Sequence, residues 1–247
     1  MRRRKIKGAD EKLLSYKHYI VNGMIDQKLP EDESNDSKSL FDNRVAVENE
    51  IYNTLIDNYR GNWNNIFKNN NPIHIEVGTG RGQFITTLAE QNPNINYIAL
   101  EIKEEVLLRA VEKADDLKLS NIAFIWGNVE FFDLYFSDKE LSRIYINFCD
   151  PWPKKRCAKR RLTYSSFLEL YRKKLNDNGD INFKTDNKDL FEFSLNEISS
   201  NDWMLRNISL DLANSDFKEN ITTEYEDKFM NLGQAIYRLE AIDIRRK

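Results

Sequence analysis

Along most of this chain, short apolar runs alternate with longer stretches in which apolar and polar residues are mixed. Four apolar runs, at 73–77, 95–102, 121–126 and 143–149, are followed by a fifth at 181–185. Each is rich in Ile, Val, Tyr or Phe, which is typical of strands buried within a sheet. The hydrophobic pattern therefore predicts at least five strands.

In the stretches between these runs, apolar residues recur every three or four positions, which is the spacing of one helix face. Ser166 and Glu169 have the spacing of a capping box, and Gly179 follows the expected end of their helix. Helices are expected over four stretches: 83–91, 104–119, from about residue 166, and 189–199.

Strands that alternate with helices predict a doubly wound α/β fold, in which helices cover both faces of a mostly parallel sheet. Two later apolar runs, 203–212 and 235–242, predict two last strands joined by a long loop, which makes a seven-stranded sheet. Such sheets bind ligands at the carboxyl ends of their strands, near the point where the strand order reverses. Functional residues are therefore expected just after the strands.

The first 60 residues differ in composition from the rest. A basic cluster occupies 2–7, the acidic and turn-rich segment 29–39 is typical of a flexible linker, and apolar positions between Phe41 and Tyr59 fit one helix face. We expect an N-terminal helical and basic extension, 1–60, followed by a single α/β domain, 61–247.

Composition narrows the class of protein. The chain has 247 residues, of which 40% are hydrophobic, so it can bury a sizeable core. Its two cysteines, Cys149 and Cys157, and its two histidines match neither a metal site nor a disulfide framework. No apolar stretch approaches the roughly 20 residues of a membrane helix, and none follows the basic start as in a secretory signal. A soluble, cytoplasmic protein is expected, with no metal and no membrane partner.

The first predicted strand leads into a glycine-rich turn, EVGTGRG at 76–82. Glycines at 78, 80 and 82 let the backbone turn sharply and approach a ligand, and the helix that follows presents free N–H groups. A nicotinamide enzyme usually has a glycine one position later, where this chain has Gln83. The form E-x-G-x-G-x-G instead resembles the first motif of S-adenosylmethionine-dependent methyltransferases.

Two carboxylates stand at the ends of the first two predicted strands. Glu101 follows the glycines by about 20 residues, where an acidic side chain binds the ribose hydroxyls of a nucleoside. Glu76 immediately precedes the turn, and it has a second interpretation as a helix cap or an ion-pair partner. A structural tight turn also remains open for the glycines. Glu101 at the strand end favours a nucleoside-containing cofactor.

The stretch NFCDPWPKKRCAKRR, at 147–161, joins the fourth predicted strand to a dense basic run. Asp150 follows this strand, which usually neighbours the first one, so it is expected to face the reactive end of a cofactor. Six of the eight residues at 154–161 are basic, although the whole chain has a net charge of −3. Such density suits a phosphate backbone; the alternatives are a solvated surface and, for Pro-Trp-Pro, a rigid corner of the core.

Together these segments resemble the bacterial tRNA (guanine-N7-)-methyltransferase family, whose members methylate guanine 46 in the variable loop of tRNA. The likeness covers about 71–240, and its most specific part is the DPWPKKR…KRR block. The other matching segments are NPIHIEVGTGRGQFI, NYIALEI, NFKTDN and NITTEYEDKFMNLGQAIYRLE. The resemblance implies a Rossmann-like class I methyltransferase fold, S-adenosyl-L-methionine as cofactor and tRNA as partner. It leaves monomer and homodimer both open.

The resemblance also implies roles for individual residues. Asp150 matches the carboxylate at the methyl-transfer site, and Asn128 stands where the family usually has an aspartate near the adenine. The positions that match cofactor binding are Glu76, Gly78, Gly80, Gly82, Glu101, Asn128 and Asp150. The positions that match substrate or tRNA binding are Lys154, Arg156, Lys159, Arg160, Arg161, Asp186, Thr223, Glu224, Tyr225 and Glu226.

Guanine N7 is unprotonated at neutral pH, so the expected mechanism needs no general base and depends on orientation. Asp150 and Asp186 are expected beside the positive charge that develops on the purine. Asp186 has an alternative role as a helix cap, and 223–226 an alternative as a solvated turn.

Three other functions remain open. Asn128 is the one residue that favours an inactive RNA-binding protein on the same fold. A small-molecule methyltransferase has no use for the basic runs, and Gln83 disfavours a nicotinamide-dependent reductase.

Overall fold

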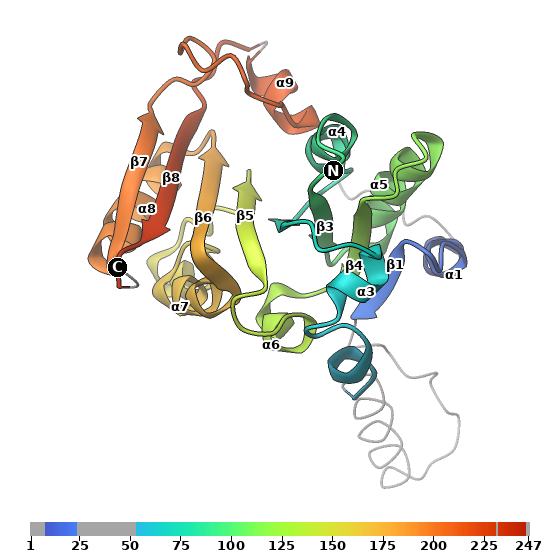
Figure 1. Cartoon of the computed structure of the whole chain (residues 1–247). Helices are drawn as coiled ribbons and strands as arrows, with labels where there is room; N and C mark the ends of the chain where they lie inside the picture. The colour runs from blue at the N-terminus through green and yellow to red at the C-terminus, as the bar shows by residue number, and fades with distance from the viewer. Residues whose placement is uncertain (1–7, 24–52, 231, 246–247) are drawn as a thin grey trace, which may run out of the picture.

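A computed structural model describes residues 8–23, 53–230 and 232–245 (Figure 1). The basic cluster at 2–7 and the linker at 29–39 lie outside these ranges. Of the helix expected before Tyr59, residues 53–58 are described and are helical. Within the described parts of the chain, no helix is both long and apolar enough to cross a membrane.

One mixed sheet holds the eight strands of the described residues, in the order β1-β4-β3-β2-β5-β6-β8-β7. Neighbouring strands are parallel up to β6, and β8 runs antiparallel to both β6 and β7. The strands are β1 (Ile20–Gly23), β2 (Ile73–Val77), β3 (Asn96–Glu101), β4 (Ile122–Gly127), β5 (Leu141–Asn147), β6 (Leu175–Thr185), β7 (Trp203–Ser209) and β8 (Tyr237–Asp243).

The mostly parallel α/β fold is confirmed, but the expected number of seven strands is wrong. The eighth strand, β1, comes from the N-terminal segment and pairs with β4, with Ile20 opposite Phe124. Its four residues, IVNG, are too few for a recognisable alternation of apolar and polar positions. Part of the segment expected to precede the α/β domain is therefore an edge strand of its sheet.

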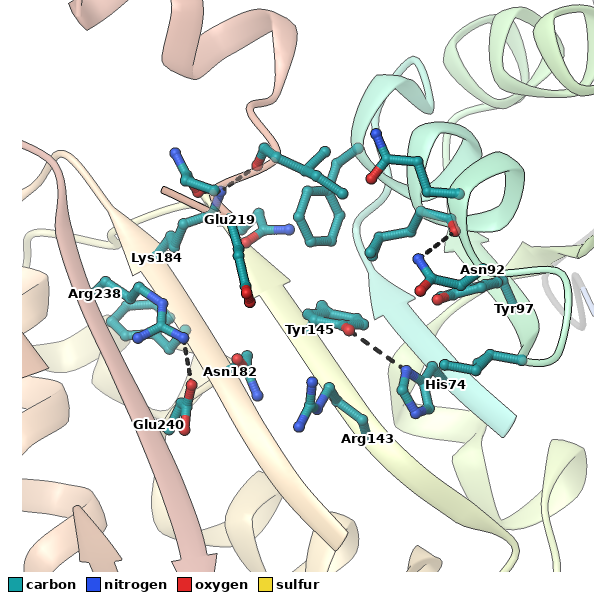
Figure 2. Close-up of a pocket in the computed structure, with 18 of the residues that line it drawn as sticks. His74, Asn92, Tyr97, Arg143, Tyr145, Asn182, Lys184, Glu219, Arg238 and Glu240 are labelled. Atoms are coloured by element: carbon teal, nitrogen blue, oxygen red, sulfur yellow. Dashed lines mark hydrogen bonds and ion pairs between the residues drawn. The ribbon is translucent and has the colours of Figure 1, made fainter. Parts of the chain in front are cut away.

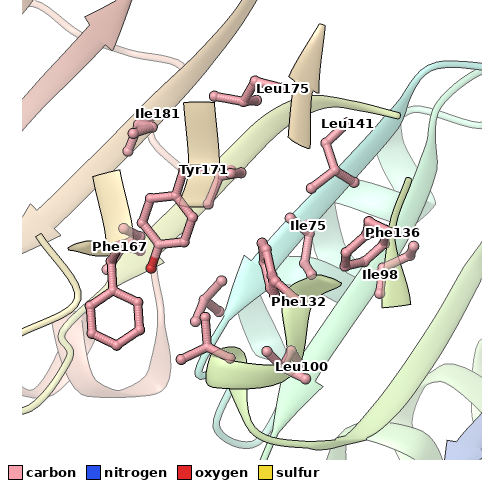
Figure 3. Packing of buried hydrophobic residues seen from close by; sticks show 14 of the residues in the cluster. Ile75, Ile98, Leu100, Phe132, Phe136, Leu141, Phe167, Tyr171, Leu175 and Ile181 are labelled. Atoms are coloured by element: carbon pink, nitrogen blue, oxygen red, sulfur yellow. The ribbon is translucent and has the colours of Figure 1, made fainter. Parts of the chain in front are cut away.

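Helices lie on both faces of the sheet. The described helices are α1 (Ala9–Ser15), α3 (Trp63–Phe67), α4 (Gln83–Gln91), α5 (Glu104–Asp116), η1 (Val129–Phe131), α6 (Phe132–Tyr135), η2 (Lys155–Arg160), α7 (Ser165–Lys174), α8 (Lys188–Ser200) and α9 (Glu224–Met230). One hydrophobic cluster joins α1, α4 and α5 to one face of the sheet. A larger cluster joins α3, α6, α7 and α8 to the other face (Figure 3).

Within the larger cluster, Ile75 and Ile98 of the sheet pack with Phe132 of α6 and Tyr171 of α7, all completely buried (Figure 3). On the other face, β5, β6 and β8 present polar side chains that line a groove. Arg143 of β5, for example, donates two hydrogen bonds to Asp180 of β6, at 2.6 and 2.7 Å. The two faces of this half of the sheet therefore differ sharply in polarity.

The expected cap of α7 is wrong. The helix begins at Ser165, and Ser166 makes no capping bond; instead Glu197 of α8 accepts a hydrogen bond from the Ser165 N–H at 2.9 Å. α7 ends at Lys174 and runs directly into β6, so Gly179 lies inside a strand. A carboxylate from a neighbouring helix replaces the local cap, which no spacing rule along one segment detects.

Candidate active site

The glycine turn after β2 is fixed by the backbone of β3. The N–H groups of Gly78 and Thr79 both donate to the Leu100 carbonyl, at 2.8 and 3.1 Å. All three glycines have positive φ, which L side chains rarely adopt. A Cβ on Gly78 or Gly80 meets nothing within 4 Å, whereas on Gly82 it comes within 2.5 Å of Ala110 Cβ. The first two glycines thus border open space, and the third lets α5 pack closely.

Glu76 is 1% exposed at the end of β2 and lies between the turn and β5. Its carboxylate accepts hydrogen bonds from Thr79 Oγ1, at 2.6 Å, and from Asn147 Nδ2, at 2.8 Å. Burial raises the pKa of Glu76 to about 7, and these two hydrogen bonds oppose that shift. The side chain therefore ties the glycine turn to the end of the neighbouring strand.

Glu101 ends β3 beside the same turn. One carboxylate oxygen accepts from the N–H groups of Ile102 and Lys103, both at 3.0 Å, and the other accepts from Gly80 N–H at 3.1 Å. Burial raises the pKa of Glu101, while the three backbone bonds lower it. These bonds orient the carboxylate at the strand end, where it was predicted to meet a ribose.

Two cavities meet at the glycine turn, and Gly78 and Phe148 line both. The first, which we call the Asp150 cavity, measures about 290 Å³. Its lining includes five predicted site residues: Gly78, Glu101, Asn128, Asp150 and Arg160. The second, the Tyr225 cavity, measures about 440 Å³. Its lining includes Glu76, Gly78, Gly80, Gly82, Thr223, Glu224 and Tyr225.

Asn128 and Asp150 line the Asp150 cavity from the ends of β4 and β5, which β3 and β2 separate in the sheet. Asn128 is the N-cap residue of η1, where its side-chain oxygen accepts from the Glu130 N–H at 3.1 Å and its amide donates to the Glu130 carboxylate at 3.2 Å. Asp150 lies three residues after the end of β5 and is exposed. The predicted pairing of β5 with β2 is confirmed, and Asp150 shares a cavity with Gly78 of the glycine turn; that Asp150 faces the reactive end of a cofactor stays a prediction.

The turn at 148–153 is held in an unusual backbone conformation. Phe148 and Trp152 have φ values of 51° and 43°, in the left-handed region. The guanidinium of Arg161 donates to the carbonyls of Pro151 and Trp152, at 3.1 and 3.0 Å. These bonds link the end of the basic run back to the turn that carries Asp150.

Residues 155–160 of the basic run form η2, which has no buried residue. Five cationic side chains of the run at 154–161 are exposed: Lys154, Lys155, Arg156, Lys159 and Arg160. The exposed Arg160 lies over the Trp152 ring, 4.9 Å from its centre. Arg161 is half-buried and contacts the Phe193 ring at 4.3 Å. The run therefore presents most of its charge to solvent while its last residue is engaged within the protein.

The segment expected to be a loop between β7 and β8 contains α9, which lies beside α4 (Figure 1). Thr223 and Glu226 form a capping box at its start. Glu226 N–H donates to Thr223 Oγ1 at 2.9 Å, and Thr223 N–H donates to the Glu226 carboxylate at 3.4 Å. The Thr-x-x-Glu spacing was present in the sequence as a signal for this helix.

Tyr225 on α9 reaches the ends of two strands. Its hydroxyl donates to the Asp186 carboxylate at 3.3 Å, and its ring centre lies 5.1 Å from that of Phe148. Asn187, rather than Asp186, caps α8 by accepting from the Leu190 N–H at 2.8 Å. The structure thus brings Asp186, Tyr225 and Phe148 together, although sequence reasoning did not identify Phe148.

The four consecutive residues predicted to contact substrate differ in exposure. Glu224 and Tyr225 are exposed, Thr223 is partly buried and Glu226 is fully buried. Glu224 forms ion pairs with Arg81 of the glycine turn, at 3.4 Å, and Lys113 of α5, at 3.1 Å. Substrate contact by these residues stays a prediction.

A third cavity, of about 440 Å³, lies on the polar half of the sheet face and is lined by none of the predicted site residues (Figure 2). Arg238 of β8 forms an ion pair with Glu240 there, and burial lowers the pKa of His74 to about 3. Lys184, another residue that the sequence analysis did not single out, lines this cavity from β6 (Figure 2). Within the described residues, no cluster of His, Cys, Asp and Glu suits a metal ion.

A family model and individual relatives both match this chain to methyltransferases. A family model described as a putative methyltransferase matches residues 70–239. The tRNA (guanine-N(7)-)-methyltransferase of Clostridioides difficile (strain 630) is 58% identical over 241 residues, which are 98% of each chain. The protein of the same name from Bacillus subtilis (strain 168) is 51% identical over 182 residues, which are 74% of this chain and 85% of the relative.

Solved structures share the fold at much lower identity. An antibiotic-related methyltransferase has a TM-score of 0.56 at 18% identity and covers 76% of this chain and 94% of its own. The 16S rRNA methyltransferase KamB has a TM-score of 0.53 at 13% identity, with coverage of 78% and 93%. These likenesses concern the fold alone, whereas the sequence matches extend over most of the chain. On those matches, this chain belongs to the tRNA (guanine-N(7)-)-methyltransferase family.

Proposed function

We propose that this protein transfers the methyl group of S-adenosyl-L-methionine to N7 of guanine 46 in the variable loop of tRNA. Relatives named for guanine-N7 methylation of tRNA match it at 58% and 51% identity. The observation that carries the proposal is the placement of Asp150 in one cavity with Gly78 and Glu101, directly before an exposed basic run. That arrangement joins a cofactor site to a polyanion-binding surface.

The residues of the two cavities fit the cofactor. Gly78 and Gly80 leave the space beside the turn open, and Glu101 presents an oriented carboxylate at the strand end. We assign the nucleoside to the Asp150 cavity, where Asn128 contributes an amide in place of the family's usual aspartate. When bound, the cofactor supplies an electrophilic methyl group on a sulfonium.

The residues near Asp150 orient the guanine and exclude water. N7 has a free lone pair at neutral pH, so the protein's task is alignment and electrostatic stabilisation. The carboxylates of Asp150 and Asp186 would lie beside the positive charge that the purine acquires. They would also accept hydrogen bonds from the N1–H and amino groups of guanine, which adenine does not match. The hydrogen bond from Tyr225 fixes the orientation of Asp186.

The exposed cations of η2 bind the tRNA backbone. Lys and Arg that neutralise phosphates release counterions, so they supply affinity without reading sequence. Lys154, Arg156, Lys159 and Arg160 are the exposed cations among the residues predicted to contact RNA. We place the enzyme in the cytoplasm, where its proposed substrate is processed.

Transfer of labelled methyl from S-adenosyl-L-methionine to an unmodified tRNA transcript tests this proposal. The control is the same transcript with guanine 46 changed to adenine. Label on the first transcript alone is the expected result. Label on both moves the target to another base, and label on neither, with folded protein and intact cofactor, favours the inactive RNA-binding protein suggested by Asn128.

A further inference from the structure

Lys184 is a buried lysine on a central strand, 5% exposed, that no step of the proposed reaction uses. Its ammonium donates to the Glu226 carboxylate at 2.6 Å, to the Ile221 carbonyl at 2.9 Å and to the Asn220 side-chain oxygen at 3.2 Å. A lysine has three N–H donors, so these bonds use all of them. All three acceptors belong to the segment 220–226, which includes the first residues of α9.

Both carboxylate oxygens of Glu226 also accept hydrogen bonds within this cluster. Its side chain is fully buried, and its second carboxylate oxygen accepts from Asn220 Nδ2 at 2.7 Å. The same residue closes the capping box with Thr223. Taking both charges out of water is costly, and an apolar pair of similar volume is often as stable. The Lys184–Glu226 ion pair therefore serves mainly to fix the position of α9 relative to β6.

The backbone of Lys184 holds a second element of the site. Its carbonyl accepts a hydrogen bond from the Phe148 N–H at 2.9 Å, at the residue whose φ is 51°. Its side chain meanwhile holds Glu226, the residue that follows Tyr225. The rings of Phe148 and Tyr225 lie against each other at 5.1 Å, and Tyr225 also donates to Asp186. Lys184 thus helps to position the rings of both Phe148 and Tyr225.

We infer that Lys184 is a positioning residue for methyl transfer: through Glu226 it fixes α9 so that Tyr225 holds Asp186 and packs on Phe148. This inference rests on the proposed function. Lys184 and Glu226 line neither the Asp150 cavity nor the Tyr225 cavity. The pair therefore acts on catalysis through the residues it places.

The test compares Lys184→Met with a matched control, Arg143→Met, in full-length protein. Arg143 belongs to another ion pair on the same sheet face, with Asp180, to which its guanidinium donates two hydrogen bonds. We expect Lys184→Met to lower kcat on tRNA by at least about tenfold, since misplacement by about 1 Å has effects of that size or more. The KM for tRNA and the affinity for S-adenosylhomocysteine, measured by calorimetry, should change by less than about twofold. Arg143→Met should leave kcat near wild type.

A double-mutant comparison with Tyr225 distinguishes a positioning role of Lys184 from a general loss of protein stability. If Lys184 acts through Tyr225, then Tyr225→Phe lowers kcat in the wild-type background but adds little to Lys184→Met. Full additivity of the two substitutions, or equal kcat losses in Lys184→Met and Arg143→Met, overturns the inference.

A milder variant keeps the inference testable if Lys184→Met does not fold. Glu226→Gln preserves size and one acceptor, and we expect the same selective loss of kcat in smaller degree; an unchanged kcat overturns the inference. The wild-type assay on tRNA is run first, because wild-type inactivity contradicts the proposed function, whereas the variant comparison addresses Lys184 alone.

Discussion

Glu76 and Glu101 show how neighbouring carboxylates at one turn acquire different roles. Glu76 is bonded by two side chains and 1% exposed, whereas Glu101 is bonded by three backbone N–H groups at a strand end that lines the Asp150 cavity. Both were predicted to bind the cofactor. The contacts of Glu76 fit a further role, as a tie between the glycine turn and β5.

The buried carboxyl of Glu76 predicts a pH-dependent stability. Its pKa rises from the ordinary 4.5 to about 7. Because the folded pKa is the higher one, the unfolded state ionises first as pH rises, so Glu76 destabilises the fold increasingly from about pH 4.5 to about pH 7. The free energy of unfolding of Glu76→Gln minus that of wild type should therefore increase by about 3 kcal/mol between about pH 4.5 and about pH 7. Urea unfolding of both proteins at several pH values measures the difference; a difference that does not vary with pH contradicts the raised pKa.

Asp150 is the residue for which turnover and binding should separate most clearly. It is exposed in the Asp150 cavity and lies outside η2, which carries the exposed cations. We expect Asp150→Ala to abolish methyl transfer while tRNA binding, followed by filter retention, stays largely intact. Asp150→Asn is the matched control for charge alone. Parallel loss of turnover and tRNA binding would refute its assignment to the transfer step.

At the scale of elements, the glycine turn lets two helices pack closely and also borders the predicted ligand site. Gly82 is the N-cap residue of α4, and its missing side chain lets that helix approach α5 at Ala110. Helix contacts of this closeness depend on a residue without Cβ, a requirement distinct from the open space at Gly78 and Gly80. The sequence pattern G-x-G-x-G does not distinguish these two requirements.

Replacing Gly82 by alanine should therefore disrupt the α4–α5 contact. The new Cβ would lie 2.5 Å from Ala110 Cβ, at a φ of +80°, so we expect a loss of more than about 3 kcal/mol of stability. Gly233→Ala is the control, because φ there is +72° but nothing lies within 4 Å, and about 1 kcal/mol should be lost. Denaturant unfolding measures both, and equal losses would show that backbone strain alone matters.

At the scale of the whole molecule, charge is distributed very unevenly. The chain has a net charge of −3, yet η2 presents a cluster of exposed cations next to the Asp150 cavity, which Arg160 lines. Such a field draws a polyanion to one side of the protein and disfavours other approaches. Arg161 differs from its neighbours because its guanidinium is bonded to two carbonyls of the turn before the run.

Two substitutions in the basic run should consequently have different effects. Lys159→Ala should weaken tRNA binding and reduce the slope of log affinity against log salt by about 1, without changing the melting temperature. Arg161→Ala should also lower the melting temperature and the affinity for S-adenosylhomocysteine, because it releases the turn that carries Asp150. Salt-dependent tRNA binding and thermal unfolding measure both variants. Identical behaviour would show that Arg161 is an ordinary phosphate contact.

The sequence by itself determined the parallel α/β core, the glycine turn and the strand ends that carry Glu101 and Asp150. Those features depend on local periodicity and on residues adjacent in the chain, which a single sequence displays directly. It also contained the Thr-x-x-Glu signal at the start of α9.

Only the tertiary structure decided which side chains meet. The strand β1, the cap of α7 by Glu197, the pairing of Lys184 with Glu226 and the contact of Phe148 with Tyr225 all join segments distant in sequence. Such contacts depend on strand order and on the approach of one element to another, which local pattern does not encode. From the run 181–185 alone, Lys184 could be solvated or buried. Its burial follows from the fold, which places Glu226 opposite it.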